Sequence, residues 1–80
     1  MKIRDPKLIG KIVKDPEILS GKPIIAGSRI SVELLLNRIA SGETYDEIIL
    51  DYPHLTKKDI SAAVEFASEL VKAVPHEISH

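Results

Sequence analysis

Residues 42–60 read "GETYDEIILDYPHLTKKDI" and contain two helix starts separated by a proline. In the first, Thr44 can cap the backbone N–H of Glu47 while the Glu47 carboxylate reaches back, which makes a capping box. In the second, Thr56 and Asp59 stand in the same relation. The proline between them ends the first helix, because it cannot donate a backbone hydrogen bond. The stretch therefore predicts a short helix, a tight connector and a longer helix.

A third helix is predicted on the N-terminal side of this stretch. Ser31 is the expected N-cap and Gly42 the stop. The apolar residues between them recur at the spacing of one helix face. They are Val32, Leu35, Leu36, Ile39 and Ala40. With the last helix running to about Val74, the sequence predicts three helices of about 10, 7 and 17 residues.

The first thirty residues have no helical period. They hold three of the five prolines and three of the four glycines, which favours turns and short extended pieces. The β-branched pairs at 12–13 and 24–25 are expected to form a small sheet, with or without residues 29–30. We therefore predict a mainly α fold: a three-helix, homeodomain-like helix-turn-helix bundle preceded by an N-terminal arm with short β-strands. Other small helical bundles share this skeleton.

The chain divides into a basic N-terminal extension at 1–14, a single helical domain at 15–74 and a tail at 75–80. Residues 1–31 carry seven basic and three acidic side chains, whereas residues 32–80 carry four basic and nine acidic ones. This asymmetry fits either separate partners, with nucleic acid at the basic end, or attraction between the two halves. The chain has no cysteine and its N-terminus lacks the apolar run of a signal peptide, so we expect a cytoplasmic protein without a membrane segment.

The loop "GKPIIAGSRIS" at 21–31 raises the question of a phosphate site. It lacks the Lys-Ser/Thr pair after the second glycine and the surrounding βαβ unit, so a scaffold role is favoured. Gly27 suits a turn with positive φ, and Arg29 is expected to pair with Asp51 or Glu47. The residues of this predicted structural motif are Gly21, Lys22, Pro23, Gly27, Arg29 and Ser31.

No stretch of the sequence favours catalysis, a cofactor or a metal. "HEISH" at 76–80 matches the zinc-binding H-E-x-x-H pattern, but it follows a proline at the end of the chain, where residues fray. The acidic residues at 43–51 suit a helix N-terminus as well as acid–base chemistry. We therefore expect a protein that is not an enzyme.

The start of the last helix is the predicted DNA-binding face. A helix-turn-helix protein presents base- and phosphate-contacting side chains at this place. The residues concerned are Thr56, Lys57, Lys58, Ser61 and Glu65. The face is mixed in sign, so binding would need a dimer and the basic arm. An ordinary solvated helix face is the alternative interpretation.

The last helix also has more apolar surface than one core needs. One stripe is formed by Ile60, Ala63, Val64, Ala67, Val71 and Val74, and a second lies beside it. Together they cover about 200° at ~100° per residue. The excess predicts a subunit or partner interface. Its residues are Leu34, Ala62, Phe66, Leu70 and Ala73. The alternative is a helix wrapped by the N-terminal arm.

The combined pattern resembles a bacterial and archaeal family, domain of unknown function 433 (DUF433). Residues 15–67 follow its D-P-x-I-x-x-G-K-P-x-I-x-G-T-R-I-x-V loop, its G-x-S-x-x-E-I-x-x-x-Y-P-x-L-T segment and its alanine-rich helix. Ser28 replaces the usual threonine, and Tyr45 stands where proline is common. The resemblance implies a helix-turn-helix-like fold and the antitoxin half of a toxin–antitoxin pair whose toxin is a PIN-like ribonuclease. It implies no catalytic residues.

Two functional hypotheses follow. The first is a dimeric antitoxin that binds its own operator DNA and neutralises a PIN-like ribonuclease. The second is a protein-interaction or dimerisation module that does not bind DNA.

Overall fold

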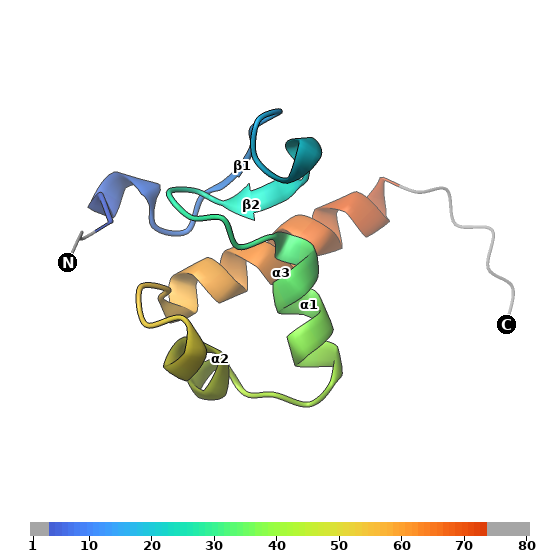
Figure 1. Cartoon of the computed structure of the whole chain (residues 1–80). Coiled ribbons are helices and arrows are strands. Elements are labelled where there is room, and N and C mark those ends of the chain that lie inside the picture. The colour runs from blue at the N-terminus through green and yellow to red at the C-terminus, as the bar shows by residue number, and fades with distance from the viewer. Residues whose placement is uncertain (1–3, 74–80) are drawn as a thin grey trace, which may run out of the picture.

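The structure is a computed structural model that describes residues 4–73 and is mostly helical, with one small antiparallel sheet (Figure 1). Its elements are the 3-10 helix η1 (Pro6–Leu8), β1 (Ile12–Lys14), the 3-10 helix η2 (Leu19–Gly21), β2 (Pro23–Ile25), α1 (Val32–Ala40), α2 (Tyr45–Asp51) and α3 (Lys57–Lys72). The three predicted helices are confirmed within a residue or two of their expected bounds. Among residues 4–73, no helix is both long enough and apolar enough to cross a bilayer. Val74 and the 76–80 motif lie outside the described residues.

The predicted caps explain where the helices begin. Ser31 Oγ accepts the backbone N–H of Leu34 at 2.9 Å. Thr44 and Glu47 form the capping box of α2, and α3 begins with a second capping box of the same kind. Each cap satisfies backbone donors that have no partner inside the helix.

The two predicted strands pair with each other. β1 and β2 are antiparallel, with Ile12 opposite Ile25 and Lys14 opposite Pro23. Residues 29–30 add no third strand; instead, the Ile25 N–H donates to the Ile30 carbonyl at 2.9 Å. A two-stranded sheet is weak alone. Here β2 packs on α1 and β1 packs on α3, so the helices support the sheet.

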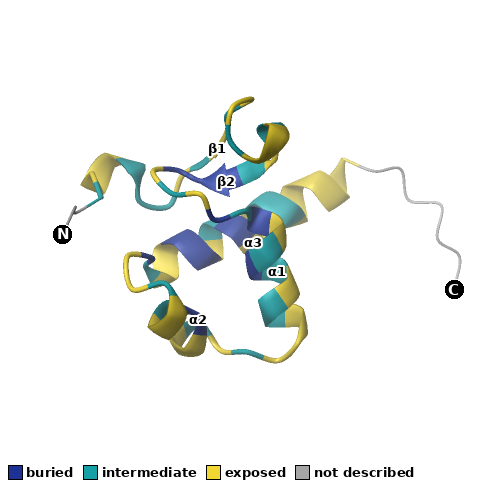
Figure 2. Ribbon diagram, viewed as in Figure 1, coloured by how far each residue is buried: buried dark blue, intermediate teal, exposed yellow. Residues whose placement is uncertain are grey.

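The core lies between the sheet and the helices α1 and α3, and α2 adds to it from the side away from the sheet (Figure 2). Its fully or nearly fully buried members are Ile25, Ile30, Val32, Leu35, Ile48, Leu55, Ile60 and Ala63. Leu55 and Ile60 flank the start of α3 and are both in this cluster, as expected for a hydrophobic staple.

The buried face of α3 lies between the two apolar stripes. Val64 and Val71, expected in the core, are 37% and 63% exposed. Phe66, expected at an interface, is half-buried against the core. Gly10 and Ile12 of the N-terminal arm line a pocket with Ala62 and Phe66, so the arm lies beside this part of the helix. The interface assigned to this side of α3 stays a prediction.

Leu34, predicted at an interface, is half-buried and packs against the core, and its place at an interface stays a prediction. One further sequence expectation is wrong. Arg29 was expected to pair with Asp51 or Glu47, but Asp51 pairs with Arg38. The Glu47 carboxylate accepts the Thr44 N–H in the capping box, and Arg29 forms an ion pair with neither acid.

Ion pairs join the basic and acidic halves of the chain. Arg4 pairs with Asp59 at 2.6 Å, and Lys22 pairs with Glu33 at 2.9 Å. Attraction between the halves is therefore confirmed within one chain.

Candidate nucleic-acid interface

The predicted DNA-binding residues lie along the start of α3. They differ in their exposure to solvent and in whether their side chains already make hydrogen bonds within the chain. Lys57, Lys58, Ser61 and Glu65 are exposed. Thr56 is occupied by its capping role: its Oγ1 donates to Asp59 Oδ2 at 2.9 Å and accepts the Asp59 N–H at 3.2 Å. Contacts to a ligand would therefore fall to the lysines and to Ser61.

The two lysines have different surroundings. Lys57 Nζ lies 3.4 Å from Asp46 Oδ1, and both side chains are largely exposed. Lys58 lies along the N-terminal arm, since a Cβ built on Gly10 would be 3.0 Å from Lys58 Cγ and Cε. Gly10 also has φ +77°, a conformation that glycine adopts without strain.

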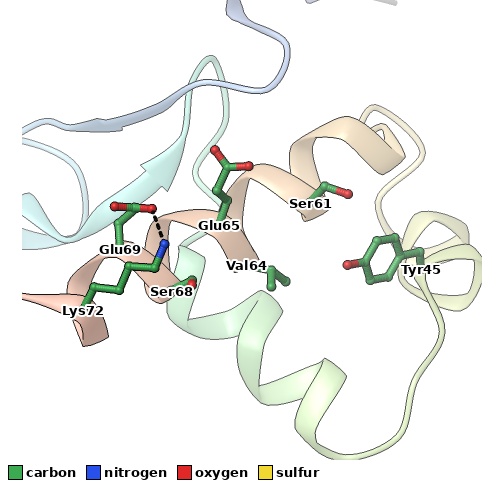
Figure 3. A pocket seen from close by; sticks show the side chains of 7 residues that line it. All are labelled: Tyr45, Ser61, Val64, Glu65, Ser68, Glu69 and Lys72. Carbon is green, nitrogen blue, oxygen red and sulfur yellow. Dashed lines mark hydrogen bonds and ion pairs between the residues drawn. The ribbon is translucent and has the colours of Figure 1, made fainter. Parts of the chain in front are cut away.

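Farther along the helix the surface becomes mixed in charge. Ser61 and Glu65 line a shallow pocket of about 490 Å³, and Tyr45 of α2 lies at one end of it (Figure 3). Glu69 and Lys72 line the other end and pair with each other at 3.2 Å (Figure 3). Among residues 4–73, no three carboxylate or imidazole groups converge as a metal site would need.

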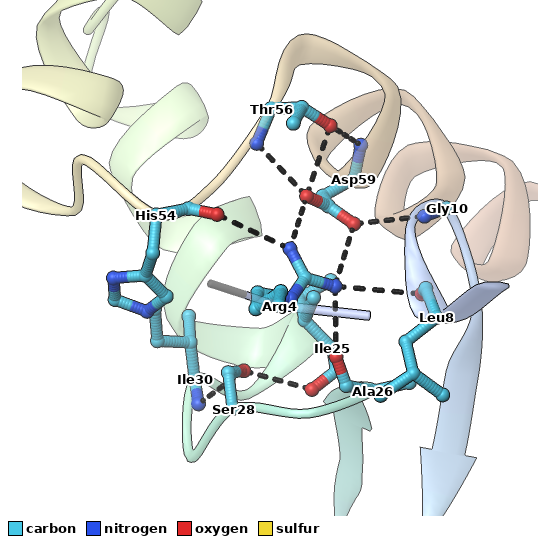
Figure 4. Close-up of polar contacts among 10 residues, drawn as sticks. All are labelled: Arg4, Leu8, Gly10, Ile25, Ala26, Ser28, Ile30, His54, Thr56 and Asp59. Atoms are coloured by element: carbon cyan, nitrogen blue, oxygen red, sulfur yellow. Dashed lines mark hydrogen bonds and ion pairs between the residues drawn. The ribbon is translucent and has the colours of Figure 1, made fainter. Parts of the chain in front are cut away.

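Arg4 anchors the N-terminal arm to the start of α3 (Figure 4). Its Nη1 donates to Asp59 Oδ2 at 2.6 Å and its Nη2 to Asp59 Oδ1 at 3.1 Å, a bidentate geometry. The guanidinium also donates to the carbonyls of Ala26 at 2.7 Å, His54 at 3.3 Å and Leu8 at 3.4 Å. One side chain thus joins the arm, the turn after β2, the α2–α3 connector and α3. We call this pair the Arg4–Asp59 clip.

Asp59 is fully buried and receives hydrogen bonds from several directions. The Gly10 N–H donates to Oδ1 and the Thr56 N–H to Oδ2, both at 2.8 Å. Burial alone would raise the pKa of Asp59, but the bonds from Arg4, Gly10 and Thr56 outweigh burial and lower the pKa to about 2. The carboxylate is therefore charged at neutral pH, and Arg4, only 7% exposed, compensates it.

The sequence identified Asp59 only as a capping residue and gave Arg4 no role. A signal was present, because Arg4 is the single arginine among the five basic residues of positions 1–14. Arginine suits buried pairs better than lysine, since its planar fork matches a carboxylate.

The sequence also did not predict a second group of interacting side chains, which lies around Arg38. Arg38 of α1 binds Glu43 and Asp51 and lies 5.6 Å from the centre of the Tyr52 ring. The hydrogen bond from Arg38 lowers the pKa of Glu43 below its usual range. This cluster joins the end of α1 to α2, and the contacts described for it are made among its own side chains.

The loop at 21–31 is built as scaffold. Gly21 and Gly27 have φ of +79° and +78°. A Cβ on Gly27 would come within 2.9 Å of Leu8 Cδ1, so Gly27 also lets the arm approach. Pro23 opens β2, and Ser31 caps α1.

A family comparison supports the sequence resemblance. The profile described as "Protein of unknown function (DUF433)" matches residues 12–67. The chain belongs to this family. A search of curated proteins finds no significant match.

A solved DUF433 structure shares the fold. It is the crystal structure of a DUF433 member from Anabaena variabilis ATCC 29413, with a TM-score of 0.74 and 29% sequence identity. The alignment covers 82% of this chain and 65% of the other, so this chain spans about two-thirds of the length of that relative.

The DUF433 match includes Asp59 but begins after Arg4 and Gly10. Two of the groups that hold the buried carboxylate therefore come from outside the matched region.

The far half of α3 carries a different surface. A groove of about 260 Å³ runs between α1, β2 and α3. Its apolar lining is Pro23, Val32, Leu36, Phe66, Ala67 and Leu70. Leu70 is 54% exposed at its edge, and Ala73 beyond it is exposed too. Of the predicted interface residues, Leu70 and Ala73 are thus accessible, whereas Ala62 and Phe66 are half-buried.

Proposed function

We propose that this protein binds double-stranded DNA through the start of α3. The supporting observation is that Lys57, Lys58 and Ser61 are exposed on the first two turns of the longest helix. The short helix α2 comes before it, and a capping box fixes the start of each helix. A helix-turn-helix protein enters the major groove with the same part of its second helix.

In this proposal some of the exposed residues contact phosphates and others contact base edges. Phosphate contacts position a protein on DNA, and contacts to base edges supply specificity. The lysines suit phosphates, and Ser61 is the nearest free hydroxyl for a base edge. Glu65 faces the same side and would reject a phosphate, which limits the DNA to the first turns of α3.

The biological role we propose is that of an antitoxin that represses its own operon and neutralises a PIN-like ribonuclease. This role rests on the resemblance described above. A dimer fits it, since two copies would double the few contacts that one copy offers.

The test compares DNA from upstream of the gene with a scrambled duplex of equal length, using fluorescence anisotropy. We expect binding that weakens with salt and a clear preference for the upstream DNA. Ser61→Ala should reduce that preference by about fivefold, the lower end of what a base contact contributes, because one hydroxyl cannot make the bidentate contact of an arginine or an asparagine. Ser68→Ala, two turns farther along the same face, is the matched control. Equal binding to both duplexes by the unmodified protein would contradict the proposal.

The apolar groove favours a second function, the protein-interaction module. An exposed leucine beside an apolar groove is typical of a partner surface. Co-expression with the protein encoded by the neighbouring gene tests it. A complex that survives purification and is lost in Leu70→Gln would support this function, whereas the same yield of complex from both chains would count against it.

A further inference from the structure

Four lysines lie on two segments that are distant in sequence but joined in the structure. Lys7 and Lys11 belong to the arm, and Lys57 and Lys58 begin α3; all four are exposed. The segments touch at Gly10, which contacts the Lys58 stem and donates its N–H to Asp59. Lys11 is the next residue along the chain, so the arm adds positive charge beside the first turn of α3.

The acids among these segments leave this charge largely uncompensated. Asp59 is buried and paired with Arg4. Asp5 is exposed, but one of its oxygens already accepts the Lys7 N–H at 2.9 Å. Asp46 of α2 faces Lys57. Residues 4–11 and the first turn of α3 thus expose four lysines and one carboxylate, that of Asp5. Glu65 and Glu69 of α3 reverse the balance, and they line a pocket with Gly10 and Ile12, so the positive strip ends at this part of the arm.

Arg4 has a different role from the lysines. Its side chain is 7% exposed and all its contacts lie within the chain, so it is not free to meet DNA. It holds residues 4–10 against the α2–α3 connector and the start of α3 (Figure 4). The lysines beside it are thereby carried on a fixed backbone rather than on a loose tail.

We propose that residues 4–11 and the first turn of α3 form one phosphate-binding strip for double-stranded DNA, with Lys7, Lys11 and Lys58 as its contacts and Arg4 as a positioning residue. The proposal rests on the proposed function and adds to it the part of the surface that meets the DNA backbone. Since phosphates carry no base identity, the strip strengthens binding to every sequence alike.

The test measures the salt dependence of DNA affinity for two double variants of equal charge. Lys7→Gln with Lys11→Gln removes the arm lysines. Lys22→Gln with Lys72→Gln is the control, because it removes two exposed lysines that pair with Glu33 and Glu69 elsewhere on the surface. Each protein is titrated with the upstream duplex and the scrambled duplex, each of about 24 base pairs, over about 50 to 300 mM KCl.

We expect the arm variant to bind both duplexes more weakly by the same factor. Each lost phosphate contact lowers the slope of log K against log salt by about 0.9, so the double variant should lose close to 2 units of slope. At about 0.1 M salt this corresponds to roughly 60-fold weaker binding. The control should keep the slope. An unchanged slope in the arm variant, or an equal loss in both variants, would overturn the strip.

A third variant tests the positioning role. Arg4→Lys keeps the charge but cannot make the bidentate pair. It should lower DNA affinity while Lys7 and Lys11 are both intact, and it should change little once they are replaced. If Arg4→Lys weakens binding equally in both backgrounds, Arg4 does not act through the arm lysines.

Failure of the strip and failure of the proposed function are distinguishable. A preference for upstream DNA that persists while the arm variant binds normally overturns the strip alone. Equal affinity for both duplexes, reduced in the arm variant, supports the strip and contradicts operator recognition. No binding to either duplex at about 50 mM salt overturns both.

Discussion

From Thr56 to Ala63, α3 is held by a buried ion pair, a capping box and two fully buried apolar side chains, whereas from Ser68 to Ala73 every residue is exposed (Figure 2). The first half has neighbours on several sides, because the arm, the turn after β2 and the α2–α3 connector all meet at Arg4. The second half has one neighbour on its apolar side, the groove wall formed by α1 and β2.

This difference separates two kinds of surface on one helix. The start is fixed by directional polar contacts, so the exposed side chains around it project from a rigid base. The end offers apolar side chains that lack a partner within residues 4–73. A rigid polar start suits DNA, and an apolar end suits a protein partner. If the two halves of α3 differ in this way, substitutions in the first half should mainly change stability, and substitutions in the second half should mainly change association.

Asp59→Ala should have the largest effect. It leaves Arg4 as a buried charge without its partner and removes the acceptor for the Gly10 and Thr56 N–H groups. Breaking a buried pair in this way costs about 3–5 kcal/mol of unfolding free energy. Urea denaturation followed by circular dichroism measures the loss, and Asp59→Asn, which keeps an acceptor oxygen, should lose less.

Glu69→Ala supplies the control for the other half of α3. It breaks the exposed pair with Lys72, and surface pairs are worth about 0–1 kcal/mol. If Asp59→Ala loses no more than Glu69→Ala, the Arg4–Asp59 clip does not stabilise the fold.

Acid should reduce the contribution of the Arg4–Asp59 clip to the unfolding free energy. The pKa of Asp59 is about 2 in the folded chain, and an unfolded aspartate has a pKa of about 3.9. Between these values the unfolded state binds more protons, so the unfolding free energy falls as the pH drops. The contribution of Asp59 is complete above about pH 5, is lost progressively down to about pH 1, and amounts to about 2–3 kcal/mol.

The other carboxylates titrate in the same range, so the measurement is a difference. Urea unfolding of the natural chain and of Asp59→Asn is compared from about pH 6 down to about pH 2. The gap between the two curves should narrow below about pH 5. A gap that stays constant would show that the Asp59 charge does not contribute through its partners.

Gly10→Ala should have a smaller effect on the same contact. Alanine at φ +77° costs about 1–2 kcal/mol of backbone strain, and its Cβ would press on the Lys58 stem. Gly42→Ala is a close match, because Gly42 has φ +96° but no atom within 4 Å of its Cβ position. Thermal unfolding should therefore show a larger loss for Gly10→Ala. Equal losses would mean that the arm does not pack closely on Lys58.

These contacts also show what could be foreseen from the sequence. Helix caps are local, since Thr44 and Glu47 are three residues apart, and all three helix starts were predicted correctly. The Arg4–Asp59 clip joins residues 55 positions apart, and no periodicity or spacing links them. Only the choice of arginine at position 4 pointed to a buried pair.

The apolar stripes show a different limit. Periodicity showed that α3 has too much apolar surface, but the side facing the core depends on where the arm and α1 pack. Gly10 and Ile12 of the arm lie across a pocket from Ala62 and Phe66, and Val64, predicted in the core, is 37% exposed. The exposure of Lys57, Lys58 and Ser61 was predicted correctly, and so was the capping box of Thr56 and Asp59. The sequence therefore assigned Thr56 both to a cap and to the DNA-binding face, and the structure shows that its hydroxyl is used by the cap.

Leu70→Gln should have the smallest effect on stability and the clearest effect on association. Fully burying a leucine contributes about 1.5–3 kcal/mol. Leu70 is 54% exposed, so its replacement should cost the single chain about 1 kcal/mol or less. The same change puts a polar group at the edge of the apolar groove and should weaken any contact made there.

Val71→Gln provides the comparison, because Val71 is 63% exposed on the same turn but does not line the groove. Sedimentation velocity over a range of protein concentrations should show association lost in Leu70→Gln and retained in Val71→Gln. Equal behaviour of the two variants would place the contact outside the groove. The second half of α3 would then be an ordinary solvated helix end, and the contrast with its first half would concern stability alone.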